Sequence, residues 1–394
     1  MSRLEWPYYE EDSIQAVTNV LKSGKVNQWT GNEVKMFEQE FSEYVGTDYA
    51  IAVSNGTTAL ELALYALDIK RGDEVIVTSR TFVASANCII TRGATPVFAD
   101  VDLKTQNISL ETIIKCITNK TKAIITVHLA GMPCDMDPIM DYAKNNNIYV
   151  IEDCAQAHGA KYKGRMVGSI GNINAWSFCQ DKIMSTGGEG GMVTLNDEML
   201  YKKAWSYKDH GKDYDLIFSD EMKKNNLFKF VHTVPGTNMR MTEMQAAIGR
   251  VLLRKLDNWV KTRRYNANIL KEGLENLNIF DILEPGKDYY HSYYKFYAFL
   301  NNDKINRNNL IEYLNKNGVK CYSGSCSEIY LEKAYSNIDS AKALNVARHL
   351  NAKKLGEISL MFLVHPTIDI VSYTKDIINF VELYIKKCLK EKQF

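Results

Sequence analysis

Between residues 50 and 195 the chain alternates short apolar runs with longer stretches of helical periodicity. Each run is apolar at nearly every position and ends in a turn or a polar cluster, which is typical of strands covered on both faces. The predicted strands are Ala50–Ser54, Glu74–Thr78, Thr95–Ala99, Ala123–Val127, Ile148–Glu152 and Ala175–Phe178. The predicted crossover helices are Thr57–Leu67, Phe82–Arg92, Leu110–Cys116 and Pro138–Lys144. This alternation predicts a doubly wound, mainly parallel sheet, in which ligands bind beyond the carboxyl ends of the strands.

The pattern changes after Pro235-Gly236. From Met241 to about Leu274 apolar residues recur on one helical face, which predicts a long helix leading out of the sheet. The remaining chain mixes strand-like and helical segments, namely Tyr293–Leu300, Asn306–Asn317 and Tyr373–Lys387. We therefore expect a large α/β domain over residues 1–249 and a smaller C-terminal α/β domain over residues 250–394.

The charge and composition of the chain exclude several classes of protein. Its 394 residues include 48 Lys and Arg against 47 Asp and Glu, so the formal net charge is +1 and we expect no nucleic-acid binding. No apolar run approaches the ~20 residues that a membrane helix needs. The eight cysteines form no Cys-x-x-Cys pair, as in proteins of a reducing compartment. With no apolar signal segment between Met1 and Glu11, we expect a cytoplasmic protein.

Two segments that directly follow predicted strands contain candidate binding groups. At Ser54–Leu60 a strand turns into a helix through Gly56, and the amides of Thr57 and Thr58 could cradle a phosphate, although these residue types more often form an ordinary helix cap. At Glu152-Asp153 two carboxylates end a buried strand. A buried Asp153 needs a cationic partner or several donors, so it could bind a protonated heterocyclic nitrogen, pair with an arginine, or cap a helix.

A third segment contains Lys182, which follows a predicted apolar strand and precedes the glycine-rich loop Gly187–Gly191. A lysine held near apolar groups loses affinity for its proton, and the neutral amine can condense with an aldehyde. Most lysines are solvated surface residues, so this position alone does not decide the role of Lys182. The loop lacks the Gly-Lys-Ser/Thr sequence of a nucleotide triphosphate site.

Taken together, six motifs resemble those of the DegT/DnrJ/EryC1/StrS aminotransferases in order and spacing. They are Asn55-Gly56-Thr57, Thr81-Phe82-Val83-Ala84, Glu152 to Gly159, Ser177-Phe178-x3-Lys182, Gly188-Glu189-Gly190-Gly191 and Gly236 to Gly249. The resemblance implies the fold of type I pyridoxal-phosphate transferases, with a large three-layer α/β/α domain and a smaller C-terminal α/β domain. It also implies the cofactor pyridoxal 5'-phosphate.

The resemblance assigns roles around the cofactor ring. Lys182 matches the lysine that forms the internal aldimine. Asp153 matches the carboxylate on the pyridine nitrogen, whose charge keeps that nitrogen protonated. Gln156 matches the side chain near the phenolic oxygen, and Phe82 the aromatic that stacks on the ring, with Ala155 behind it.

The resemblance also assigns the phosphate contacts. These come from the turn at Gly56, from the amides of Thr57 and Thr58, and from Ser177. Asn238 matches a residue that reaches the phosphate from the neighbouring subunit. The chain is therefore expected to form a homodimer with shared active sites.

In this family an amino donor, usually L-glutamate, passes its nitrogen to the cofactor and then to a ketone, with the lysine moving the proton. The expected acceptor is a nucleotide-linked keto-sugar that serves surface polysaccharide biosynthesis. One group of the family carries His in place of the lysine and performs a dehydration, so the presence of Lys182 favours transamination.

The acceptor side departs from the family pattern. We expect His210, Tyr293, Tyr322 and His365 to face the substrate. The segments Cys321–Tyr330 and Ser359–Pro366 match only loosely, which leaves open a small phosphorylated ketone such as dihydroxyacetone phosphate, or a fold relative with a regulatory role. A metal site at Cys321 and Cys326 would lack further ligands, so no metal is expected.

Overall fold

The computed structural model describes residues 5–219, 230–338 and 349–391. Its largest element is a seven-stranded sheet, and several of its strands end at one cavity. The strands lie in the order β1 (Tyr49–Val53), β9 (Gly191–Leu195), β8 (Ile173–Ser177), β5 (Tyr149–Asp153), β4 (Thr121–Val127), β2 (Glu74–Thr78) and β3 (Thr95–Ala99). Neighbours from β8 to β3 are parallel, whereas β9 pairs antiparallel with both β1 and β8. The predicted mainly parallel sheet is therefore confirmed.

Both faces of this sheet are buried, which explains the continuous apolar runs. In β1, Ile51 and Val53 belong to one hydrophobic core and Ala50 and Ala52 to another, as the alternation of side chains along a strand requires. Helices on the first side include α3 (Gly56–Ala66), α4 (Ala84–Thr91), α7 (Glu198–Lys208) and α8 (Tyr214–Ile217). The others are α1 (Glu11–Ser23), α2 (Glu33–Val45), α5 (Leu110–Ile114), α6 (Met136–Asn145) and α10 (Glu243–Leu253). The result is a three-layer α/β/α arrangement.

A second, four-stranded sheet follows along the chain, in the order β10 (Phe280–Ile282), β12 (Phe296–Leu300), β14 (Ser359–Phe362) and β13 (Cys321–Tyr322). Its core is shared with α11 (Leu256–Glu275), α12 (Arg307–Lys316) and α15 (Ile370–Glu391), while α14 (Leu350–Ile358) precedes β14. A small sheet of β11 (Tyr289–Tyr290), β6 (Lys161–Tyr162) and β7 (Arg165–Met166) joins the two parts of the chain. Short 3-10 turns lie at Leu129–Gly131, Ile329–Leu331 and Lys333–Tyr335.

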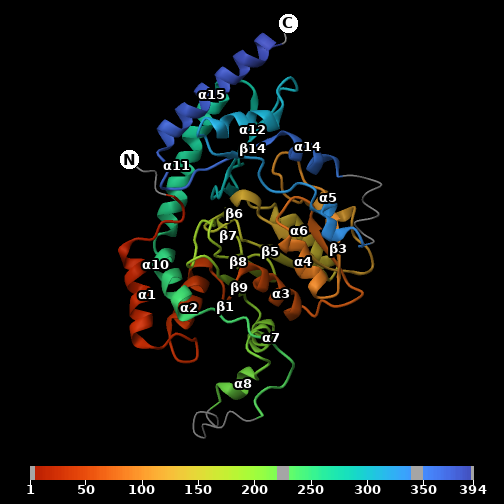
Figure 1. Ribbon diagram of the computed structural model, residues 1–394. Coiled ribbons are helices and arrows are strands. Elements are labelled where there is room, and N and C mark those ends of the chain that lie inside the picture. The colour runs from red at the N-terminus through yellow and green to blue at the C-terminus, as the bar shows by residue number, and fades with distance from the viewer. Residues whose placement is uncertain (1–4, 220–229, 339–348, 392–394) are drawn as a thin grey trace.

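The predicted helix from Met241 to Leu274 is two helices. The chain turns at Arg254-Lys255, between α10 and α11. There Lys255 Nζ lies 2.6 Å from Glu10 Oε2 and 2.8 Å from Asp12 Oδ2. Both carboxylates lie at the start of α1, which packs along α10 (Figure 1).

Among the described residues, no helix is both long and apolar enough to span a bilayer.

Candidate active site

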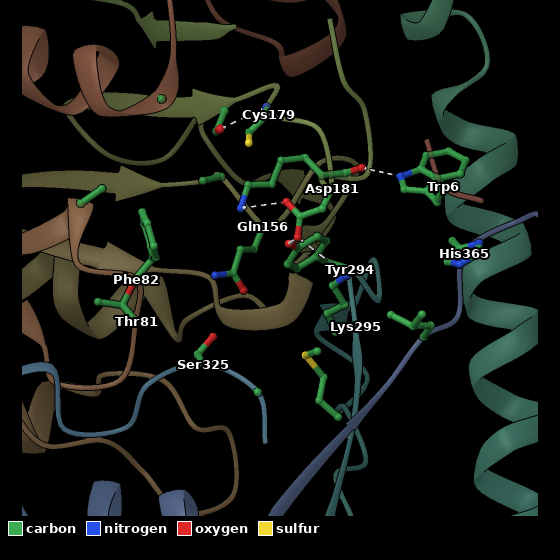
Figure 2. Close-up of a pocket in the computed structure, with 18 of the residues that line it drawn as sticks. Trp6, Thr81, Phe82, Gln156, Cys179, Asp181, Tyr294, Lys295, Ser325 and His365 are labelled. Atoms are coloured by element: carbon green, nitrogen blue, oxygen red, sulfur yellow. Dashed lines mark hydrogen bonds and ion pairs between the residues drawn. The ribbon is translucent and has the colours of Figure 1, made fainter. Parts of the chain in front are cut away.

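A cavity of about 1190 Å³ lies where the strands of the large sheet end, facing the second sheet. The large sheet supplies Asp153 at the end of β5, Ser177 at the end of β8 and Gly56 just after β1. The second part of the chain supplies Tyr294, Lys295, Tyr322 and His365, some of which Figure 2 shows, and the N-terminal segment supplies Trp6. The position of the cavity is the one predicted for a doubly wound sheet.

The turn into α3 forms a concave pocket of backbone beside Ser177. A Cβ added to Gly56 would lie 2.5 Å from the Cβ of Ser177, so only glycine lets the helix begin this close to β8. Asn55 Oδ1 accepts a hydrogen bond from the amide of Thr58 at 2.9 Å, and Thr58 Oγ1 accepts one from the amide of Asn55. The Thr58 amide is therefore used by this cap. The amides of Gly56 and Thr57, which have no acceptor within the helix, remain for an anion.

Asp153 is a buried carboxylate on the floor of the cavity, with 5% of its surface exposed. Ser85 Oγ donates to its Oδ2 at 2.7 Å, and the amide of Ala155 donates to its Oδ1 at 3.1 Å. Burial raises the pKa of Asp153, although Ser85, the Ala155 amide and the charge of Lys182 act in the opposite direction. Within the described parts of the chain no cationic side chain lies at ion-pair distance, so the geometry favours a partner that comes from a ligand.

Glu152, the other carboxylate of this strand end, is buried, and groups of the protein itself supply its hydrogen-bond donors. It accepts hydrogen bonds from His128 Nε2 at 3.0 Å and from the amides of Gly168, Ile170 and Gly171 at 3.0, 2.8 and 2.6 Å. Because His128 Nδ1 accepts from the Cys134 amide, its proton sits on Nε2. Burial alone would raise the pKa of Glu152, but these donors lower it.

His128, Glu152 and Cys154 are also close enough together to suggest a metal site. Both nitrogens of His128 are already hydrogen-bonded, and burial raises the pKa of the Cys154 thiol. We therefore interpret this group as structural.

Lys182 extends into the cavity from the loop after β8, with 16% of its side chain exposed. Its Nζ lies 3.9 Å from Asp181 Oδ1 and 5.0 Å from the centroid of the Tyr294 ring. The hydroxyl of Tyr294 donates to Asp181 Oδ2, and Trp6 Nε1 donates to the carbonyl of Lys182 at 2.7 Å (Figure 2). The amine of Lys182 thus lies beside Asp181 and Tyr294, while Trp6 bonds the backbone of the same residue.

Phe82 and Gln156 complete the inner part of the cavity. The ring of Phe82 follows β2 and is 67% exposed, although most phenylalanines are buried. Gln156 Oε1 accepts from the amide of Ala130 at 2.8 Å, which fixes its side chain. Ala155 lines the same cavity. An exposed aromatic face beside an enclosed amine and carboxylate suits a flat, polar-edged ring.

The remaining predicted residues divide between two places. Tyr322 and His365 line the cavity, whereas Tyr293 does not; its ring stacks on His291 at 3.8 Å, and the neighbouring Tyr294 faces the cavity instead. His210 and Asn238 are exposed outside the cavity, on two segments joined by a hydrogen bond from the His210 amide to the Thr237 carbonyl.

Sequence reasoning missed several lining residues, among them Trp6, Asp181, Arg263, Lys295 and Tyr297. Asp181 could have been noticed because it directly precedes Lys182. The others come from distant segments, and no local pattern marks them.

Comparison with known proteins points to one family. The model of the DegT/DnrJ/EryC1/StrS aminotransferase family matches residues 7–361. A GDP-perosamine synthase of Escherichia coli O157:H7 is 44% identical over 264 residues, which are 67% of this chain and 68% of that protein.

Solved structures point to the same family. An aminotransferase from Psychrobacter cryohalolentis has 48% sequence identity and a TM-score of 0.93, with 98% of this chain and 99% of that chain covered. The GDP-4-keto-6-deoxy-D-mannose-3-dehydratase of E. coli with bound hydrated PLP has 26% identity and a TM-score of 0.83, with 96% and 98% covered.

Proposed function

Because the chain belongs to the DegT/DnrJ/EryC1/StrS aminotransferase family and is a pyridoxal-phosphate-dependent aminotransferase, we propose that it transfers the amino group of L-glutamate to a nucleotide-linked keto-sugar. The reaction takes place in the cytoplasm and serves surface polysaccharide biosynthesis. One observation carries the proposal: Lys182, Asp153 and the Gly56 turn, which are far apart in the sequence, face one cavity of about 1190 Å³.

The residues of the cavity fit the cofactor. Asp153, buried with no cationic partner among the described residues, suits a protonated pyridine nitrogen, and the Gly56 and Thr57 amides with Ser177 suit a phosphate. The exposed face of Phe82 suits the ring. When bound, pyridoxal phosphate supplies an electron sink for the carbanion at the α-carbon of the substrate.

The chain supplies the acid-base chemistry and the exclusion of water. Lys182 Nζ would hold the cofactor, and as a free amine it would act as the base for the proton on the α-carbon of the amino donor. Asp181 and Tyr294 lie beside this amine and orient it. Asp153 stays ionised once a positive charge lies beside it, because an opposite charge outweighs the effect of burial. Trp6 lines the same cavity and is tied to the Lys182 carbonyl by a hydrogen bond.

Two features support a large acceptor. The cavity is larger than the ~300–1,000 Å³ that enclose a typical ligand, so space remains beyond the cofactor for a nucleotide-linked sugar. The relative from E. coli O157:H7 is named a GDP-perosamine synthase, and its product is an amino sugar linked to a nucleotide. Lys182 favours transamination over the dehydration named for the more distant E. coli relative.

We also propose a homodimer with shared active sites. Asn238 and His210 are exposed outside the cavity of their own chain. Asn238 is therefore available to reach the cavity of a second copy. A size measurement with and without pyridoxal phosphate tests this; a monomer that is fully active would contradict it.

The acceptor is tested by incubating the purified protein with pyridoxal phosphate, glutamate and a panel of keto-compounds, with products identified by mass spectrometry. The panel contains GDP-, dTDP- and UDP-linked keto-sugars and dihydroxyacetone phosphate, and Lys182→Ala serves as the control. We expect an amino sugar and 2-oxoglutarate from one nucleotide class. Amination of dihydroxyacetone phosphate alone would overturn the nucleotide-sugar assignment and leave the transamination chemistry intact.

A further inference from the structure

We propose that Arg263 and Lys295 form an oxyanion-binding subsite on the wall of the cavity made by the second sheet and α11. The subsite takes a carboxylate or phosphate group of the substrate. The proposal rests on the proposed function in one respect, because a substrate that carries such a group has to enter this cavity.

The topology of the second sheet brings basic residues to one edge. Phe362 at the end of β14 is paired with Phe296 at the start of β12 and with Cys321 at the start of β13. Lys295 and Lys320, each one residue before its strand, therefore flank the chain as it leaves β14. Both line the cavity.

Arg263 lies behind this edge on α11 and is only 2% exposed. Its Nη1 donates to the carbonyl of Tyr294 at 3.2 Å, but its Nε and Nη2 are buried without a hydrogen-bond partner in the described structure. No carboxylate lies within ion-pair distance among the described residues, and the guanidinium carbon of Arg263 lies 4.9 Å from the centroid of the Trp6 ring. Burial lowers the pKa of Arg263 to about 9. A buried guanidinium with two unused donors is costly unless an anion binds it.

Lys295 is only partly neutralised by the protein. Its Nζ lies 3.8 Å from Asp181 Oδ2, but the same carboxylate is 3.9 Å from Lys182 and accepts from Tyr294. Burial, together with the charges of Arg263 and Lys182, lowers the pKa of Lys295 to about 8 despite the attraction of Asp181. Lys320 pairs at 3.4 Å with the exposed Glu5 and stays at the rim. The inner wall thus has more positive charge than its carboxylates balance.

The donor set defines the ligand chemistry. A guanidinium presents parallel donors that match two oxygens of a carboxylate or phosphate, and an ammonium adds a point charge. A cationic ligand would be repelled. Two groups of the expected substrates meet this description: a carboxylate of the amino donor and a phosphate of the acceptor.

The test measures binding without turnover. Glutarate and inorganic diphosphate serve as probes, titrated calorimetrically into the cofactor-loaded protein, the wild type and the variants Lys295→Met and Lys295→Arg. The matched control is Lys316→Met, since Lys316 is 72% exposed, is paired with Glu312 and lies on α12. We expect Lys295→Met to weaken one probe about tenfold or more, Lys295→Arg to restore it to within threefold, and the control to match the wild type.

The probe that weakens identifies the source of the oxyanion. Weaker glutarate binding assigns the subsite to the donor carboxylate, and weaker diphosphate binding assigns it to the phosphate of the acceptor. In kinetics, Lys295→Met should raise the KM of that substrate while kcat stays within about threefold, which a merely structural role would not produce. The proposal is overturned if neither probe binds the wild type, or if Lys295→Met binds both as the wild type does. These outcomes do not depend on any sugar being aminated, so they are separable from the acceptor screen.

Discussion

Replacing Asp153 by Asn tests the role of the buried carboxylate, because it removes one negative charge and keeps the shape of the side chain. Asp153 is 5% exposed and receives one hydroxyl and one amide hydrogen bond. A charge in such surroundings shifts the pKa of an opposite partner by ~1–3 units, and each unit corresponds to ~1.4 kcal/mol. If that stabilisation is expressed in the transition state, the variant loses about 10- to 1,000-fold in rate.

The assay is a single-turnover reaction of the cofactor-loaded protein with glutamate, followed by the absorbance of the cofactor. Ser85→Ala is the graded control, since it removes only the 2.7 Å hydrogen bond to Asp153 Oδ2 and leaves the charge. It should lose about tenfold. Asp153→Glu keeps the charge but displaces it, and should fall between wild type and Asp153→Asn.

Thermal unfolding of the cofactor-free protein separates a catalytic role from a structural one. Burial raises the pKa of Asp153, so the ionised carboxylate costs stability at neutral pH while no cation is bound. The melting temperature of cofactor-free Asp153→Asn should equal or exceed that of the wild type. A rate within threefold of wild type, or a melting temperature several degrees lower, would refute this reasoning.

Three further predictions follow from packing, burial and protonation. Gly56→Ala places a Cβ 2.5 Å from that of Ser177, so cofactor affinity should fall at least tenfold by titration, whereas Gly286→Ala, whose Cβ would meet nothing closer than 3.6 Å, should leave it unchanged. Arg80→Met leaves the buried acceptors of a fully buried guanidinium unsatisfied, and should cost about 3 kcal/mol of stability; an unchanged melting temperature would contradict this. Burial lowers the pKa of His158 to about 3, so the folded state binds fewer protons and stability is lost as the pH falls from 6.5 toward 3, by up to ~1.4 kcal/mol per pH unit. Melting curves of His158→Phe should show a smaller loss over this range, and identical pH profiles would count against the assignment.

The sequence predicts the large sheet well because its strands are buried on both faces and end in recognisable turns. The predicted strands at Glu74–Thr78 and Thr95–Ala99 coincide with β2 and β3. The motif resemblance to the DegT/DnrJ/EryC1/StrS family is confirmed. The helix break at Arg254-Lys255 is not predictable from local pattern, because no Gly or Pro marks it and the apolar periodicity continues across it.

The outer part of the site was harder to predict, since it depends on contacts between distant segments. Tyr293 and Tyr294 are adjacent, yet of the two it is Tyr294 that lines the cavity, next to a backbone turn at Tyr293 with a φ of 49°. Arg263 and Lys295 line the same cavity because α11 packs against the second sheet, which no spacing in the sequence encodes. The Thr58 amide donates to Asn55 Oδ1 in the helix cap. A helix cap was one of the two roles, beside phosphate binding, that the sequence left open for this turn.

The most direct test of the account is to locate the cofactor. The protein is loaded with pyridoxal phosphate, reduced with borohydride, digested and sequenced by mass spectrometry. We predict a phosphopyridoxyl group on Nζ of Lys182 and its absence in Lys182→Ala. A wild-type protein that remains unlabelled at Lys182, or that carries the group at another lysine, would contradict the central claim.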